Sequence, residues 1–215
     1  MVLYLTGIDG SGKSTIAKYL KDNVFTNKEV ISIWARYQPK IVKFLLLGVK
    51  KKYIIDKTKP YLMDEEKYSN WVNFKKKITK IQFLKKVFFT IQAVDYIFQL
   101  KKINKKIKKN KDKIIIIDRY YLDFIVDQSL NYGDIENWFF TKYFLKKTKK
   151  VDYIIYINVD KKIAFDRKDD IPSLEYFVGR KETYQKYINL CDNAFTIDNN
   201  KHLTDTIEKI KTIIQ

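Results

Sequence analysis

The chain contains five short apolar runs. They are separated by longer segments, in which the apolar positions follow helical spacing. The runs are rich in Val, Ile, Leu and Tyr, which is typical of strands buried in a sheet. The clearest run is "KIIIID", in which four isoleucines stand in a row. The predicted strands cover 2–6, 29–35, 113–118, 152–159 and 194–197.

Between these runs, apolar residues return every three or four positions, which predicts helices. A long helical region is predicted from Glu65, capped by Asp64, to about Lys109. The other predicted helices cover 14–25, 41–49, 121–131, 135–147, 160–168, 174–190 and 203–214. Strands that alternate with helices imply an α/β fold, a parallel sheet with helices on both faces. No repeat or change in composition marks a boundary, so residues 1–215 are expected to form one domain.

The segment after the first strand, "GIDGSGKST", matches the phosphate-binding pattern G-x-x-x-x-G-K-[ST]. Gly7, Gly12, Lys13 and Ser14 occupy its fixed positions. Glycines let the backbone N–H groups converge on an anion, and the following helix adds its positive end. The lysine can reach the β- and γ-phosphates of ATP, and the serine hydroxyl can bind Mg²⁺. The residues expected to hold ATP here are Gly7, Asp9, Gly10, Ser11, Gly12, Lys13, Ser14 and Thr15.

A second polar group follows the isoleucine run, in "DRYYLDFIVDQ". Asp118 ends a buried strand, and ligands bind at the carboxyl ends of strands in sheets of this class. A carboxylate at this point can hold Mg²⁺, directly or through water, so Ser14 and Asp118 are the predicted metal ligands. Arg119 can clamp a phosphate, although an Asp–Arg pair that only caps the following turn is the alternative.

The chain is strongly basic, with a formal net charge of +18. Such a charge fits either nucleic-acid binding or a solvated, lysine-rich surface. The lysine run at 101–113 favours the second reading, because Ile103 and Ile107 lie on one helical face. Only four of the 43 basic residues are arginines, which suggests that arginine stands where a planar, bidentate donor is needed.

The single cysteine, Cys191, allows no internal disulfide, which fits a reducing compartment. No signal peptide is visible, and the apolar region 81–100 is broken by Lys85, Lys86 and Asp95, so no membrane span is expected. The predicted location is therefore the cytoplasm.

"GIDGSGKST", followed about a hundred residues later by "DRY", resembles the thymidylate kinase family of nucleoside monophosphate kinases. A glutamine follows "DRY" in that family, as Gln128 does here, and "NVDKKIAFDR" (158–167) and "FTIDNN" (195–200) are similar to its later segments. The resemblance covers most of the chain. It implies a three-layer P-loop kinase fold with five parallel strands and a short lid at about 168–176. It also implies phosphoryl transfer from ATP to a nucleoside monophosphate, above all dTMP, and a homodimer formed by helix packing.

The resemblance also implies roles for single residues. Asp9 would contact the sugar or the acceptor network, and Arg36 would bind the acceptor phosphate. Arg119 would bridge the donor and acceptor phosphates. Asn199 would lie near adenine, and Arg167 near adenine or the lid. Gly10 stands where some members carry an arginine, so a residue in or after the lid must meet the transition-state charge: Lys168, Arg180 or Lys181. The catalytic candidates are Lys13, Asp9, Arg119, Arg36, Arg167 and Arg180.

The segment that would recognise the base departs from the family. It reads "FFTIQAVDYIFQL" (88–100) and has no arginine where the family often carries one. Asp123 stands where the family often has Ser, and Asp127 where it has Tyr. The candidate substrate contacts are Asp9, Arg36, Phe89, Gln92, Asp95, Arg119, Asp123 and Gln128. The alternative for 88–100 is an amphipathic core helix.

Two other functions stay open. The first is a kinase of the same fold that acts on another nucleotide, a nucleoside or a small phosphorylated metabolite. The second is a nucleotide-dependent nucleic-acid-binding protein, which only the basic charge supports.

Overall fold

The computed structural model describes residues 1–41, 73, 81–168 and 174–214. Its centre is a five-stranded, all-parallel sheet with the strand order β2-β3-β1-β4-β5. The strands are β1 (Val2–Thr6), β2 (Val30–Trp34), β3 (Ile114–Asp118), β4 (Tyr153–Asn158) and β5 (Ala194–Asp198). All five predicted strands are present, with ends within one residue of prediction, and the α/β class is confirmed.

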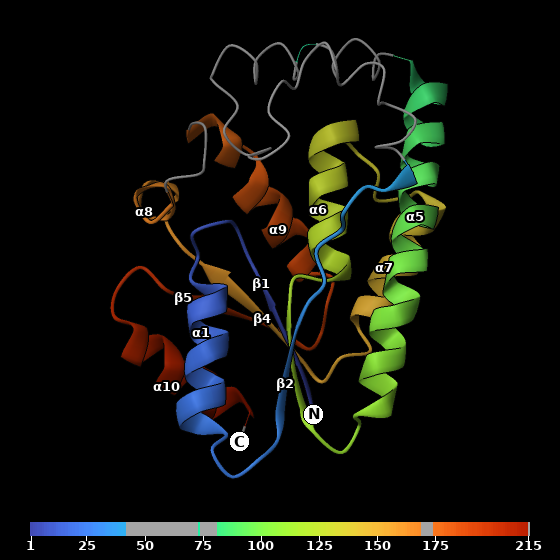
Figure 1. The fold of residues 1–215 in the computed structure, drawn as a ribbon. Helices are drawn as coiled ribbons and strands as arrows, with labels where there is room; N and C mark the ends of the chain where they lie inside the picture. Colours follow the sequence, from blue (N-terminus) through green and yellow to red (C-terminus); the bar gives the residue numbers. More distant parts are fainter. Residues whose placement is uncertain (42–72, 74–80, 169–173, 215) are drawn as a thin grey trace.

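Helices cover both faces of the sheet, which gives three layers (Figure 1). One face carries α1 (Lys13–Tyr19), continued by the π-helix η1 (Leu20–Val24), and α10 (Leu203–Ile214). The other face carries α5 (Gln82–Lys109), α6 (Tyr121–Tyr132), α7 (Phe139–Thr148) and α9 (Arg180–Ile188). Two short elements, α8 (Lys161–Asp166) and the 3₁₀-helix η2 (Leu174–Phe177), complete the described chain.

Side chains alternate between the two faces of the sheet along each strand, so they contribute to two apolar cores. Leu3 and Leu5 of β1 pack with Ile16 and Ile207 on the side of α1 and α10. Tyr4 points to the opposite side, where aromatic residues from α5, α6 and α7 fill the space between sheet and helices. The isoleucines of β3 serve both cores, which explains why that strand reads as a continuous apolar run.

Helix boundaries differ more from prediction than strand boundaries do. The predicted helix 174–190 is two elements, because Gly179 takes a left-handed φ of 73° between η2 and α9. The predicted helix 135–147 begins only at Phe139, and 14–25 changes from α to π after Tyr19. The predicted helix 41–49, the first part of the region that starts at Glu65 and most of the lid lie outside the described residues.

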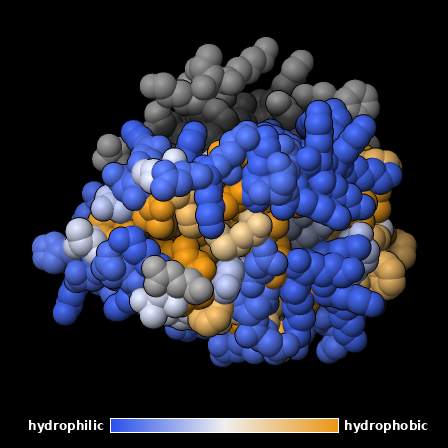
Figure 2. Space-filling model, turned by 90° about the horizontal axis from the view of Figure 1, so that it is seen from below, coloured by the Kyte–Doolittle hydropathy of each residue, from blue (hydrophilic) through white to orange (hydrophobic). Residues whose placement is uncertain are grey.

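The lysine run on α5 forms the predicted polar face. Lys101, Lys105 and Lys109 are exposed, whereas Ile103 and Ile107 pack against the core. Hydrophilic residues also dominate the face seen from below, on which both termini lie (Figures 1 and 2). Within the described part of the chain, no helix is long and apolar enough to span a membrane.

Candidate active site

The loop between β1 and α1 has the backbone shape of a phosphate cradle. Gly10 and Gly12 have φ angles of +78° and +90°, which residues with a side chain rarely adopt. A Cβ on Gly10 would lie 2.2 Å from the carbonyl oxygen of Ala164, and one on Gly12 would lie 2.7 Å from Nδ2 of Asn199. Both glycines are therefore required by close contacts as well as by conformation.

Asn199, which follows β5, supports the loop from behind. Its Nδ2 donates to the carbonyl oxygen of Ser11 at 2.8 Å, and its Oδ1 accepts a hydrogen bond from Thr206 at 2.8 Å. Both Nη atoms of Arg167 donate to the carbonyl oxygen of Asn199 at 3.2 Å. The two residues predicted to lie near adenine are thus in contact, and they join the end of α8 to the phosphate loop.

Lys13 is buried and turned into the loop that precedes it. Its Nζ donates to the carbonyl oxygens of Gly7 (3.0 Å) and Ile8 (2.7 Å) and to Oγ of Ser11 (3.0 Å). Burial lowers the pKa of Lys13 to about 7, and the neighbouring positive charge of Arg119 acts in the same direction. Among the described residues no carboxylate pairs with this ammonium group, and a phosphate would supply the missing negative charge.

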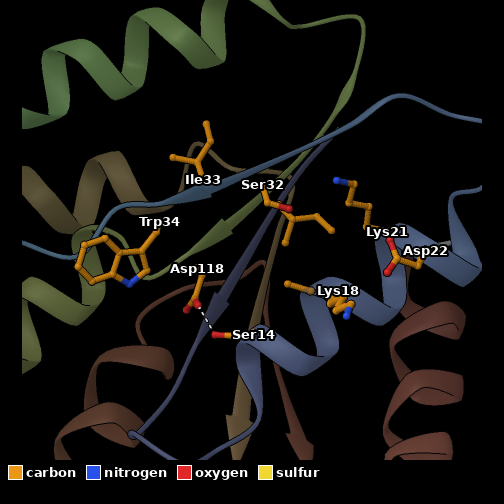
Figure 3. A pocket seen from close by; sticks show the side chains of 10 residues that line it. Ser14, Lys18, Lys21, Asp22, Ser32, Ile33, Trp34 and Asp118 are labelled. Carbon is orange, nitrogen blue, oxygen red and sulfur yellow. Dashed lines mark hydrogen bonds between the residues drawn. The ribbon is translucent and has the colours of Figure 1, made fainter.

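Ser14 and Asp118, the predicted metal ligands, are in contact. Oγ of Ser14 donates to Oδ2 of Asp118 at 2.9 Å (Figure 3). The other oxygen, Oδ1, is buried and has no hydrogen-bond partner among the described residues. A buried carboxylate oxygen without a donor, beside a serine hydroxyl, suits a hydrated Mg²⁺ ion. A cavity of about 560 Å³ between α1 and β2 opens beside this pair, with Trp34 and Lys18 also in its lining.

Arg119 has a strained backbone that directs its side chain into the site. Its φ of 64° is the only positive value at a non-glycine position in the described chain. Such a conformation costs on the order of 1–3 kcal/mol. The guanidinium lies against the Asp9 carboxylate from the phosphate loop and 3.3 Å from Asp123. Burial alone would raise the pKa of Asp9, but the arginines beside it outweigh burial and hold that pKa well below its ordinary range.

A network of charged groups extends from Asp9 toward α6 and α9. Oη of Tyr176 donates to Asp9 at 2.7 Å and accepts from Arg36 at 3.5 Å. Arg36 lies 3.7 Å from Asp9 and 4.0 Å from Asp127. Arg180 donates to Asp127 at 2.5 Å and to the carbonyl oxygen of Tyr176 at 3.0 Å. Three of the four arginines of the chain thus meet beside the phosphate loop, as their scarcity suggested.

Asp123, predicted to contact substrate, instead lies in the core with its oxygens saturated. It accepts hydrogen bonds from Tyr4 (2.5 Å), Tyr184 (2.7 Å), Arg119 (3.3 Å) and the backbone N–H of Tyr120 (2.9 Å). The carboxylate is 1 % exposed and caps α6. Its role in this structure is to tie Arg119 to β1 and α9.

The predicted base-recognition residues divide into two groups. Phe89 is buried among aromatic rings of α6 and α7, and Asp95 accepts hydrogen bonds from Tyr37 and from the backbone of residues 40 and 41. These two side chains serve the core, in agreement with the alternative reading of 88–100. The carbonyl oxygens of Gln92 and Gln128 are buried and have no hydrogen-bond partner among the described residues.

Sequence reasoning missed two members of the network, Tyr176 and Asp127. For Asp127 a signal existed, because it follows Asp123 by four residues and both lie on α6, where that spacing brings two side chains to one face. For Tyr176 no local pattern points to the site. It lies in η2 and donates to Asp9 across 167 positions of the sequence.

Comparisons with known proteins agree with this geometry at the level of fold. No protein-family model matches the chain, and no curated protein matches its sequence. Among solved structures, a thymidylate kinase from Candida albicans is similar over 99 % of this chain and 90 % of its own, with a TM-score of 0.60 and 16 % sequence identity. The chain therefore has the fold of a thymidylate kinase, which is a nucleotide kinase fold.

Proposed function

We propose that the protein transfers the γ-phosphoryl group of ATP to a nucleoside monophosphate, with dTMP as the first candidate. The observation that carries the proposal is the meeting of Arg36 and Arg119 with Asp9 beside the phosphate loop. A nucleoside has no phosphate for such arginines to bind, whereas a monophosphate has one. The fold shared with a thymidylate kinase supports dTMP.

The residues of the chain divide the work by position. In this proposal the loop N–H groups and Lys13 hold the donor phosphates, and Arg119, which lies against Asp9 of the loop, contacts both donor and acceptor. Arg36 has long, weak contacts with its carboxylate neighbours and can turn to an acceptor phosphate. Phosphoryl transfer needs positioning and charge neutralisation rather than a covalent group from the protein.

Ser14 and Asp118 would hold Mg²⁺, in agreement with their hydrogen bond and the unpartnered Oδ1. When bound, the ion neutralises phosphate charge. An Asp118→Asn variant should therefore need more Mg²⁺ for half-maximal turnover, while its KM for the acceptor changes little.

The decisive assay is ADP release from ATP–Mg²⁺ with dTMP, dUMP, UMP, CMP, dCMP, AMP, GMP or thymidine. Turnover with one or more monophosphates and none with thymidine is the expected result. Arg36→Met should lower kcat/KM for the acceptor roughly a hundredfold, which is typical for loss of one charged donor. Lys211→Met, on the exposed surface of α10, is the matched control. Turnover of thymidine, or an unchanged acceptor KM in Arg36→Met, would contradict a monophosphate acceptor.

We also propose a homodimer that packs through α5. Phe83, Val87 and Phe98 are exposed on this helix, at spacings that place them along one stripe. Exposed apolar stripes of this kind mark protein interfaces.

A further inference from the structure

Asp127 lies between two arginines but contacts them unequally. Its Oδ1 accepts a hydrogen bond from Nη1 of Arg180 at 2.5 Å, whereas its Oδ2 lies 4.0 Å from Nη2 of Arg36. The first contact is a close, charge-assisted hydrogen bond, and the second is at the limit of an ion pair. All three side chains are largely buried, with exposed fractions of 24 % for Asp127, 14 % for Arg180 and 28 % for Arg36.

The position of Arg180 is fixed by contacts besides Asp127. Its Nε donates to the carbonyl oxygen of Tyr176 at 3.0 Å, and its guanidinium carbon lies 4.2 Å from the centre of the Tyr176 ring. The residue begins α9 directly after Gly179, so its backbone is fixed as well. Two of its nitrogen atoms donate hydrogen bonds and its guanidinium packs on the Tyr176 ring, so Arg180 is held toward Asp127 and Tyr176.

Asp127 would bind Arg36 if Arg180 did not neutralise it. A buried carboxylate without a partner is strongly unfavourable, and among the described residues the other cation paired with Asp127 is the guanidinium of Arg36. A tight Asp127–Arg36 pair would compete with the phosphate of an incoming monophosphate. Burial alone would raise the pKa of Asp127, yet Arg180 and Arg36 lower it, so the carboxylate stays charged. A charged Asp127 can compete with the phosphate for Arg36.

We propose that Arg180 is a positioning residue: it occupies the Asp127 carboxylate and so leaves Arg36 available to bind the phosphate of the acceptor nucleotide. The inference rests on the proposed monophosphate acceptor and deepens it. It changes the role of Arg180 from a direct contact of the transferred group to a partner of Asp127. It also gives a function to Asp127, because that carboxylate sets the orientation of Arg36 while Arg180 is in place.

The test compares wild type, Arg180→Gln and the double variant Asp127→Asn/Arg180→Gln by calorimetric titration with dTMP and, separately, with ATP–Mg²⁺. Arg180→Gln should weaken dTMP binding by about tenfold or more, because an unpaired carboxylate about 4 Å from Arg36 attracts it strongly. Binding of ATP–Mg²⁺ should change less than about threefold, since Arg180 has no contact with the phosphate loop. The double variant Asp127→Asn/Arg180→Gln should bind dTMP within about threefold of wild type.

Two further variants separate this role from a general loss of structure. Arg180→Lys keeps a cation near Asp127 and should restore most of the dTMP affinity. Glu182→Gln, which removes only a surface pair with Lys161 in the first turn of α9, should leave both affinities unchanged. Thermal unfolding of each variant shows which ones fold.

The outcomes are distinct. If the double variant binds dTMP as weakly as Arg180→Gln, Arg180 acts through Tyr176 and the inference is overturned. Equal losses for dTMP and ATP–Mg²⁺ would overturn it as well. If wild type binds none of the monophosphates of the turnover assay, the proposed function fails, and the inference fails with it; if wild type binds dTMP and Arg180→Gln binds it equally well, only the inference fails.

Discussion

ATP binding should draw a proton into the site through Lys13. The pKa of this buried lysine is about 7. Lys13 is therefore neutral in about half of the molecules at pH 7 and in about nine-tenths of them at pH 8. Phosphates beside the ammonium favour its charged form and raise that pKa on binding. Binding of ATP–Mg²⁺ should therefore take up about 0.5 proton at pH 7 and about 0.9 at pH 8. Because uptake grows with pH, affinity should fall above pH 7, by at most about tenfold per pH unit.

Calorimetry in buffers with different ionisation heats measures this uptake directly. The slope of apparent binding enthalpy against buffer ionisation heat gives the number of protons bound at each pH. Lys13→Arg provides the matched comparison, because it keeps a cation that does not titrate in this range. A slope that is equal at pH 7 and pH 8 in wild type would refute the reasoning. A slope that persists unchanged in Lys13→Arg would assign the proton to another group.

Three further predictions concern the stability of the fold and the assembly of the dimer. Gly10→Ala should lower the free energy of unfolding by about 1–3 kcal/mol and abolish turnover, because its Cβ meets the Ala164 carbonyl oxygen at 2.2 Å; thermal melts and ADP release test this. Asp123→Asn should lower the free energy of unfolding by about 3–5 kcal/mol in urea titrations, because the buried Arg119 guanidinium loses a carboxylate partner and the hydroxyls of Tyr4 and Tyr184 lose a charged acceptor. Phe83→Glu should raise the dimer dissociation constant about tenfold or more in sedimentation experiments, and a charge at Phe98 should act likewise.

Each of these predictions has a control in the same chain. Gly179→Ala has similar backbone strain, but its Cβ meets only the tip of a leucine side chain at 3.3 Å, so it should cost less than Gly10→Ala. Asp134→Asn removes an exposed carboxylate and should leave the free energy of unfolding unchanged. Phe139→Glu changes an exposed phenylalanine on α7 and should not affect dimer formation. A control that behaves like its partner variant would contradict the corresponding prediction.

The sheet and the phosphate loop were predictable from sequence because local signals determine them. The isoleucines of β3 are buried on both sides, so a continuous apolar run is enough to identify the strand. The spacing of Gly7, Gly12 and Lys13 identifies the loop, since few other residue types fit its backbone.

The charged network was only partly predictable, because tertiary contacts choose its pairs. The sequence suggested that arginine stands where a planar, bidentate donor is needed. It did not pair Arg180 with Asp127, which lies 53 residues away. Asp123 and Asp95 looked like candidate contacts for substrate, yet tyrosines from distant segments occupy their oxygens. Helix ends were missed for a related reason: Gly179 breaks a segment whose apolar spacing is continuous.

The hydrogen bond from Asn199 to the carbonyl of Ser11 joins two segments that lie 188 residues apart in the sequence, and this has a consequence for synthesis. The phosphate loop leaves the ribosome well before β3, β4 and the residue that supports the loop. A growing chain therefore carries the whole phosphate motif long before the motif has its shape. Cellular ATP, although abundant, should give no help to partly made chains, and its stabilising effect should begin only when the segment after β5 is free to fold.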